Sequence, residues 1–354
     1  MTFVRNTWYA AGWAEAFNTT PLIGRRILDE PLAIYRQDDG AFAALSDTCP
    51  HRFAPLHLGQ LRPGGRIQCP YHGLQFDASG QCVRNPHGNQ SVPGRARVKS
   101  YPVVERYGIV WVWMGAAAAD AARIPDLRVF HSVDHRLASR RDYINLQADY
   151  RLITENLLDL SHVSFLHKGI LGDEDTISAA IEIHASQSGF CVSRSMPGVR
   201  APGLFDQLFR RNGATVDLWA DMHWWSPGCL LNHAGVTDPG HPREEGTGIH
   251  GLHLLTPETP TSTHYFFFAV RWNPTFHGEP IDTEVRQNVS ELRRYAFEKQ
   301  DQVIIAAQQR AMLDPTINTA RPVYLEIDVG PSKFRLALRD LLQQEQTGAG
   351  VTPA

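Results

Sequence analysis

The sequence predicts an α+β protein with two domains: an N-terminal domain of short β-strands, and a C-terminal domain that combines longer strands with a long helix. Short strand-like segments separated by turn residues fill the first third of the chain. Longer strand segments and one long helical segment follow. A length of 354 residues is enough for two hydrophobic cores. An alanine-rich stretch before Pro125 suggests the boundaries 1–124 and 125–346, with a flexible tail at 347–354.

The strands of the first domain are indicated by turn residues. Residues 32–36 and 41–45 flank Asp38-Asp39-Gly40, which predicts a β-hairpin. Residues 103–114 predict a second strand pair, interrupted at Tyr107-Gly108.

The second domain mixes helices and strands. Helices are expected at 150–162, 283–312 and 332–344, the long one ending at Asp314-Pro315. Pro257 and Pro274 are expected to end two strands. The expected strands are 177–194, 217–225, 229–237, 249–255 and 264–272.

Bulk composition limits the functional classes. A net charge of −3 with interspersed acids and bases favours neither a nucleic-acid partner nor an anionic membrane. The longest apolar run, residues 107–119, is too short to span a bilayer, and no signal peptide is recognisable, so we expect a cytoplasmic protein without a membrane partner. Five cysteines, an odd number, argue against a disulfide framework, and sixteen histidines suggest metal binding.

The first candidate metal motif pairs cysteine with histidine twice. Cys49 and His51 form one half, and Cys69 and His72 form the other. Two thiolates and two imidazoles suit an iron–sulfur cluster in which histidines replace two of the usual cysteines. A structural zinc site could use the same four ligands. Zinc fingers, however, group their cysteines before their histidines, whereas each half here contains both.

The second candidate motif places two histidines five residues apart. In a regular helix the side chains of His162 and His167 would diverge by about 140°. They can therefore share a metal only if the helix ends or distorts between them. Asp159 lies three residues before His162, where its carboxylate can hold an imidazole N–H. The alternative is a pair of ordinary core histidines.

A ferrous site that activates dioxygen combines two histidines with one carboxylate. Asp301 is the candidate, because helical spacing from Phe297, Ile304 and Ile305 places it on the apolar stripe of the long helix. A lone acid there is unfavourable unless it is paired or binds a metal. The alternatives, which we expect to be more exposed to solvent, are Glu291, Glu298 and Asp314.

Taken together, these motifs resemble the Rieske non-haem iron oxygenases, in particular the oxygenase components of the vanillate and dicamba O-demethylases. The resemblance covers nearly the whole chain, including residues 4–9, 49–56, 69–74, 155–162 and 255–259. It implies an N-terminal Rieske domain built on antiparallel β-sheet, and a C-terminal catalytic domain with an antiparallel sheet around a long helix, similar to helix-grip folds. It also implies a Rieske [2Fe–2S] cluster on Cys49, His51, Cys69 and His72, and a mononuclear Fe(II) on His162, His167 and Asp301. It further implies a role for Asn156 beside the iron, and a homotrimer in which Asp159 links the cluster of one subunit to the iron of its neighbour.

The resemblance also implies an activity. It is the O2-dependent oxidation of an aromatic acid, most simply an O-demethylation that releases formaldehyde. Electrons would come from a separate NAD(P)H-linked reductase of flavin or ferredoxin type, because the chain has neither a dinucleotide-binding fingerprint nor a four-cysteine ferredoxin motif. The alternatives are methyl or ring hydroxylation of an arylsulfonate or phthalate-like acid, or an electron-transfer protein without catalysis.

Substrate contacts are also implied by the resemblance. Asn232 and His253, each in a predicted strand, are expected to contact the substrate carboxylate, since an amide and an imidazole can both donate to an oxyanion. Trp219, Trp224 and Phe267 are candidate walls of the substrate pocket, although aromatic residues in strands are commonly core.

Overall fold

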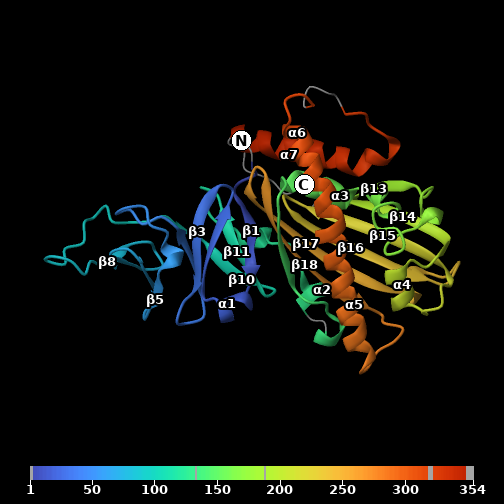
Figure 1. Ribbon diagram of the computed structural model, residues 1–354, viewed down its shortest axis with the longest axis horizontal. Helices are drawn as coiled ribbons and strands as arrows, with labels where there is room; N and C mark the ends of the chain where they lie inside the picture. The colour runs from blue at the N-terminus through green and yellow to red at the C-terminus, as the bar shows by residue number, and fades with distance from the viewer. Residues whose placement is uncertain (1–2, 132–133, 187–188, 318–321, 348–354) are drawn as a thin grey trace. The chain divides into compact units, whose positions relative to one another are not determined.

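The computed structural model describes residues 3–131, 134–186, 189–317 and 322–347 (Figure 1). The chain divides into two compact units. The N-terminal unit contains the described residues up to Ile124 together with Thr256–Pro260, and the C-terminal unit contains the rest. Of the expected tail at 347–354, all but Thr347, where the last helix ends, lies outside the described residues.

The N-terminal unit is built from three antiparallel sheets. The predicted hairpin around Asp38-Asp39-Gly40 is confirmed as β3 and β4, and the pair interrupted at Tyr107-Gly108 is confirmed as β10 and β11. In spatial order the sheets are β1 (Thr7–Trp13), β11 (Ile109–Met114) and β10 (Val103–Arg106); β2 (Leu22–Ile27), β3 (Glu30–Arg36), β4 (Phe42–Ser46) and β9 (Ser100–Tyr101); and β5 (Gln60–Arg62), β6 (Arg66–Gln68), β7 (Gln75–Phe76) and β8 (Cys82–Arg84).

The C-terminal unit is organised around one seven-stranded antiparallel sheet (Figure 1). Its strands are long, and successive residues point to opposite faces. In spatial order they are β12 (Asp142–Leu146), β18 (Ser262–Trp272), β17 (Thr247–Thr259), β16 (Cys229–Thr237), β15 (Thr215–Trp225), β14 (Gly189–Arg200) and β13 (Ile181–Ser186).

Two expectations about these strands are wrong. Residues 177–194 do not form one strand, because β13 and β14 pair as a hairpin in which Ser186 lies opposite Gly189. Ser186 and Gly189 are residue types that favour turns, and they mark the end of one strand and the start of the next. Pro257 does not end β17, which continues to Thr259. A proline has no N–H to donate, but its carbonyl can still accept a hydrogen bond. The carbonyl of Pro257 accepts from the backbone N–H of Leu28 at 2.9 Å.

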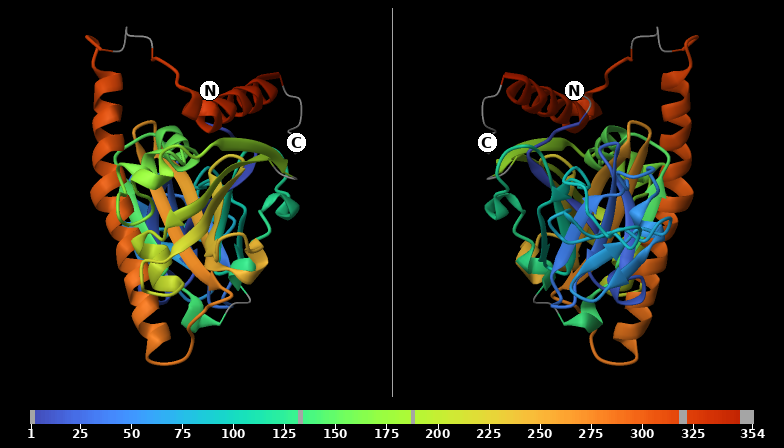
Figure 2. Two further views of the ribbon diagram at one scale, coloured as in Figure 1. Left: turned by 90° about the vertical axis from the view of Figure 1, so that its right-hand side faces the viewer. Right: turned by 90° about the vertical axis from the view of Figure 1, so that its left-hand side faces the viewer.

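The long helix lies along one face of the sheet (Figure 2). It consists of α5 (Ile281–Tyr295), a π-turn η7 (Ala296–Asp301) and α6 (Gln302–Leu313), with Asp314 as its C-cap, as predicted. The shorter predicted helix is α7 (Val329–Thr347). In the part of the chain that the structure describes, no helix has both the length and the apolar character needed to cross a membrane.

A third helix, α3 (Tyr150–Leu158), precedes the two histidines of the second motif. Asp149 caps its N-terminus by accepting from the backbone N of Arg151. The short helices are α1 (Ala16–Thr19), α2 (Arg128–His131) and α4 (Gly203–Leu208).

Two candidate metal centres and an apolar pocket

The two Cys/His loops of the N-terminal unit share one backbone design. Cys49 lies between β4 and the short helix η1 (Leu56–Leu58), and Cys69 lies between β6 and β7. In the first loop the N–H of Cys49 donates to the carbonyl of Ala54, and the N–H of Phe53 donates to the carbonyl of Cys49. The second loop repeats this pattern with Cys69, Leu74 and Gly73. Phe53 and Gly73 have positive φ values of 60° and 72°. The loops are thus close backbone copies that differ in where the histidine stands.

These loops bring like ligands together. Cys49 and Cys69 are buried, and the Cys69 thiol is close enough to contribute to the pKa of Cys49. Burial and this contact raise the pKa of Cys49 to about 11. The rings of His51 and His72 lie side by side, with centroids 4.5 Å apart, and His51 is exposed. One pair of sulfurs and one pair of nitrogens fit the two different irons of a Rieske cluster.

The zinc alternative is less well supported by this geometry. A tetrahedral zinc needs all four ligand atoms around one point, about 2.0–2.3 Å from the ion. Among the described residues, only His162, His167 and Asp301 form a group of three metal-binding side chains with all ligand atoms within 4.8 Å of one another. The Cys/His set is more spread out, as a two-iron group requires.

The helix expected at 150–162 ends earlier, at Leu158, so neither histidine of the second motif lies on it. Asp159 is the C-cap of α3, and His162–Ser164 forms a 3-10 turn, η4. His162 Nδ1 pairs with the backbone carbonyl of Asp159 at 2.5 Å. The prediction that the Asp159 carboxylate holds this imidazole is therefore wrong. The chain turns at the cap, so the carbonyl faces the ring, and the carboxylate accepts instead from the backbone N and the hydroxyl of Ser161.

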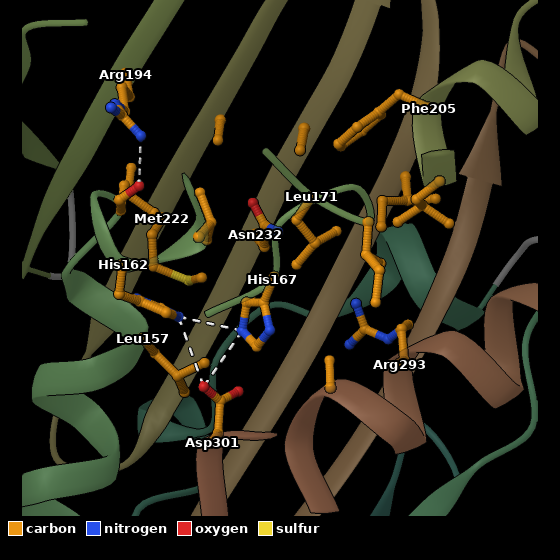
Figure 3. A pocket seen from close by; sticks show the side chains of 18 of the residues that line it. Leu157, His162, His167, Leu171, Arg194, Phe205, Met222, Asn232, Arg293 and Asp301 are labelled. Atoms are coloured by element: carbon orange, nitrogen blue, oxygen red, sulfur yellow. Dashed lines mark hydrogen bonds and ion pairs between the residues drawn. The ribbon is translucent and has the colours of Figure 1, made fainter. Parts of the chain in front are cut away.

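His162, His167 and Asp301 converge at the pocket (Figure 3). The two Nε2 atoms are 3.2 Å apart, and Asp301 Oδ1 lies 3.2 Å from His167 Nε2 and 3.6 Å from His162 Nε2. Burial lowers the pKa of His162, which keeps the imidazole in the neutral form that binds metals. Burial would also lower the pKa of His167, but its hydrogen bond with Asp301 raises it overall. Two imidazoles and one carboxylate fit a non-haem ferrous ion with open coordination positions.

Two amide side chains hold these groups in place. Asn156, on α3, donates to Asp301 Oδ1 at 3.2 Å. Gln300 accepts from His167 Nδ1 at 2.9 Å and donates to the carbonyl of Leu166 at 2.7 Å. Gln300 was missed by sequence reasoning, although its position next to Asp301 was a signal. Such partners fix the orientation of a metal-binding imidazole.

The π-turn explains how Asp301 reaches the site. Asp301 is 4% exposed, whereas Glu298 forms ion pairs with Arg294 and Lys299. The apolar stripe used to predict it is only partly present, because Ile304 is 53% exposed. A π-turn inserts a residue and shifts the helical phase, and such turns are frequent at functional sites.

An apolar pocket lies beside the three groups, between the sheet and the long helix (Figure 3). One face of the sheet forms its floor, because the lining residues on each strand are two residues, or an even number, apart. The floor consists of Arg194, Met196, Leu218, Ala220, Met222, Asn232, Ala234, Ile249 and His253. Leu171, Phe205 and Phe297 supply walls, whereas the candidate walls Trp219, Trp224 and Phe267 do not line it.

Asn232 and His253 both line this pocket. His253 Nδ1 lies 2.6 Å from the hydroxyl of Tyr265, which has no other acceptor within the described chain. The hydroxyl proton is therefore directed to Nδ1, which leaves a proton on Nε2. Nε2 is buried and has no partner among the described residues, and the same holds for Asn232 Oδ1. Burial lowers the pKa of His253 well below its usual value, so this imidazole is a neutral donor.

Comparison with known proteins supports both kinds of iron cofactor. Residues 7–102 match the family profile of the Rieske [2Fe-2S] domain, and residues 146–344 match that of the vanillate O-demethylase oxygenase C-terminal domain. The oxygenase component of dicamba O-demethylase from Stenotrophomonas maltophilia is 38% identical over 98% of this chain and 99% of its own. The oxygenase component of chloroacetanilide N-alkylformylase from Rhizorhabdus wittichii is 34% identical over 97% of each chain.

A solved structure extends this similarity to the fold. Dicamba monooxygenase bound to 3,6-dichlorosalicylic acid superposes with a TM-score of 0.88 at 37% identity, covering 98% of this chain and 99% of that one. The match confirms the predicted α+β class and the two kinds of iron cofactor. The chain is an oxidoreductase that belongs to the Rieske non-haem iron oxygenases, in the family of the vanillate and dicamba O-demethylase oxygenase components.

Proposed function

We propose that this chain oxidises a methoxy- or methyl-substituted aromatic acid with O2, most simply as an O-demethylase that releases formaldehyde. The observation that carries the proposal is a pocket with apolar walls, with the three candidate iron-binding groups on one side and unpartnered polar groups on its floor. Such a pocket can take a flat ring and orient it through one polar substituent. Relatives named as dicamba and vanillate O-demethylase components support the reaction class.

The residue roles follow from the donor chemistry. His162, His167 and Asp301 would hold the ferrous ion, with Asn156 and Gln300 fixing their positions. Cys49, His51, Cys69 and His72 would hold the [2Fe–2S] cluster. When bound, the cluster supplies single electrons and the iron supplies O2 activation. The protein groups orient the substrate and keep water away from the reacting carbon.

Electrons must come from outside the chain. A separate NAD(P)H-linked reductase of flavin or ferredoxin type is the partner we propose. The exposed His51 edge of the cluster site, flanked by Phe53 at 77% and Tyr71 at 61% exposure, is chemically suited to face another protein. In a homotrimer the Asp159 carboxylate would connect this edge of one subunit to the iron site of the next.

A substrate panel tests the proposal. The reconstituted enzyme and a reductase are given methoxybenzoates, methylbenzoates and methylbenzenesulfonates under 18O-labelled O2. O-Demethylation predicts one formaldehyde and one phenol per O2 consumed. Methyl hydroxylation instead predicts labelled benzylic alcohol, and ring hydroxylation predicts labelled phenol without formaldehyde. Reduction of the cluster without oxidation of any acid would contradict the proposal.

A further inference from the structure

One polar group in the pocket has no role in the account above. Arg293, on α5, extends into the pocket from the same long helix that carries Asp301 (Figure 3). The side chain is buried, at 6% exposure, yet within the described chain its only hydrogen bond is a 3.5 Å contact from Nη2 to the carbonyl of Phe268. Nε has no partner there. The guanidinium also lies over the face of Phe297, 5.2 Å from the ring centroid.

The other two buried arginines have strong partners, although Nε of Arg271 also lacks one within the described chain. Arg194 also lines the pocket, but it donates to the carbonyls of Leu160, Thr176, Ile177 and Ala179 and to the Ser164 hydroxyl. Arg271 forms an ion pair with Asp282 at 2.9 Å. Among the buried arginines of the described chain, Arg293 alone lacks both a carboxylate and a full set of carbonyls.

Such a charge is unfavourable in the ligand-free protein. Moving an unpaired ion away from water destabilises the fold unless a partner compensates. The carboxylate of Asp142 is already bound by Arg140 and Arg294. Burial lowers the pKa of Arg293 to about 10, so the guanidinium remains a cation at neutral pH. A cation kept in this position is explained if the ligand supplies the anion.

The sheet is shaped to receive this guanidinium. Gly251, on β17, lies opposite Asn232 on β16. A Cβ added at Gly251 would lie 2.9 Å from Arg293 Nη1 and 3.4 Å from Asn232 Cβ. The absent side chain therefore provides the space for the guanidinium. His253 is two residues further along β17, on the same face, so Arg293, Asn232 and His253 surround Gly251.

The π-turn places this group and the metal site in one pocket. In a regular α-helix, two positions eight residues apart are rotated by about 80° relative to each other. The π-turn η7 lies between Arg293 and Asp301, and its wider turn rotates each residue by less. Both side chains consequently face the sheet, one at the metal site and one over Gly251.

We infer that Arg293, together with Asn232 and His253, forms an oxyanion site that makes this enzyme select aromatic substrates bearing one carboxylate or sulfonate group. The inference rests on the proposed function, in which the methoxy or methyl group of the substrate reacts at the iron site. An arginine can give two parallel N–H donors to a carboxylate, and the apolar surroundings strengthen that ion pair. Loss of the negative charge leaves the guanidinium unpaired, so neutral anilides of the kind named in one relative are selected against.

The test measures binding on the holoenzyme by calorimetry, with three probes: meta-methoxybenzoate, its neutral amide and the matching sulfonate. Wild type should bind both anions at least tenfold more tightly than the amide. Arg293→Met should weaken binding of the anions about 10- to 100-fold, the range for a hydrogen bond to a charged group, and leave amide binding unchanged. A loss limited to the carboxylate or to the sulfonate identifies which oxyanion the site is built for.

Stability separates binding from a structural role. Arg293→Met removes an unpaired buried charge and should leave the ligand-free Tm unchanged or raise it. The matched control Arg194→Met should lower the Tm, because it leaves several buried carbonyls without donors. An unchanged preference for anions over the amide in Arg293→Met would overturn the inference, as would a lowered Tm with unchanged binding.

A second variant keeps the inference testable if Arg293→Met does not fold. Arg293→Lys keeps a charge but loses the paired donors, and should reduce the preference for anions severalfold. An unchanged preference in that variant would overturn the inference too. If anions bind through Arg293 but no formaldehyde is released from any methoxy acid, the proposed function fails and the inference stands. If formaldehyde is released and the arginine variants bind normally, the inference fails and the proposed function stands.

Discussion

The two candidate metal centres are built in opposite ways. The proposed cluster ligands lie on two short loops that are close in sequence and share one backbone hydrogen-bond pattern, and the histidine side of that site is exposed. The proposed iron ligands come from the turn after α3 and from a π-turn far along the chain, and they are buried or half-buried beside an apolar pocket. The first arrangement suits electron exchange with another protein. The second suits a small molecule that must be kept from water.

The assignment of the cluster ligands can be tested by exchanging a single sulfur atom for oxygen. Cys69→Ser should abolish the visible iron–sulfur absorption and all turnover, because the cluster iron requires a thiolate. The buried free Cys82, which the account gives no ligand role, is the control: Cys82→Ser should keep the absorption. A full cluster spectrum in Cys69→Ser would show that the ligand assignment is wrong.

The iron half depends on a single buried carboxylate. Asp301→Ala should lose the mononuclear iron and reduce turnover by about 1,000-fold or more, while the cluster spectrum stays intact. Glu298→Ala, three residues away but ion-paired at the surface side, should keep the iron. Full iron occupancy and activity in Asp301→Ala would move the carboxylate role to another acid.

The link between the centres is tested by an isosteric change. Asp159→Asn should keep both centres and lose most turnover, about 100-fold, if the carboxylate connects subunits in a trimer. The local fold should survive, since an amide oxygen can still accept from the backbone N of Ser161. Rapid cluster reduction coupled to an unimpaired rate of product formation would rule out this role.

The same contrast explains what the sequence could and could not predict. The proposed cluster ligands could be predicted because the two short loops that carry them are recognisable from their spacing in the sequence. The spacing of His162 and His167 correctly excluded a regular helix through both residues, although α3 ends at Leu158, before the first of them. Asp301 was found through regular helical periodicity, although the π-turn breaks that periodicity at Ile304. Arg293 was missed, because a regular helix would not place it with Asp301, and only the tertiary fold shows that Gly251 leaves space for a guanidinium. Gln300 was missed although it is adjacent to Asp301, because successive residues of a regular helix point about 100° apart.

Gln300 offers a subtler test of the buried centre. Gln300→Ala should weaken iron affinity about 10- to 100-fold, because His167 Nδ1 loses the acceptor that orients its ring. Gln300→Glu, which keeps an acceptor, should retain most of the affinity. Equal iron affinity in Gln300→Ala and wild type, measured by competition with a chelator, would remove this role.

The smallest effect is expected for a neutral donor in the pocket. His253→Ala should raise the KM for an aromatic acid by about tenfold, equivalent to roughly 1.5 kcal/mol for one hydrogen bond to a charged acceptor. Both iron centres should stay filled. Because His253 is neutral, the KM of wild type should not vary between pH 6 and 8 through this residue. An unchanged KM in the variant, across all accepted acids, would exclude His253 from the binding site.

The separation of the two centres is the central claim, and iron content tests it most directly. We expect about three irons per chain in wild type, about one in Cys69→Ser and about two in Asp301→Ala, with the cluster absorption present in the first and the last. Iron is to be counted on the purified chains by mass spectrometry, beside the visible spectrum. Loss of all iron from either variant, or about two irons in wild type, would contradict the claim.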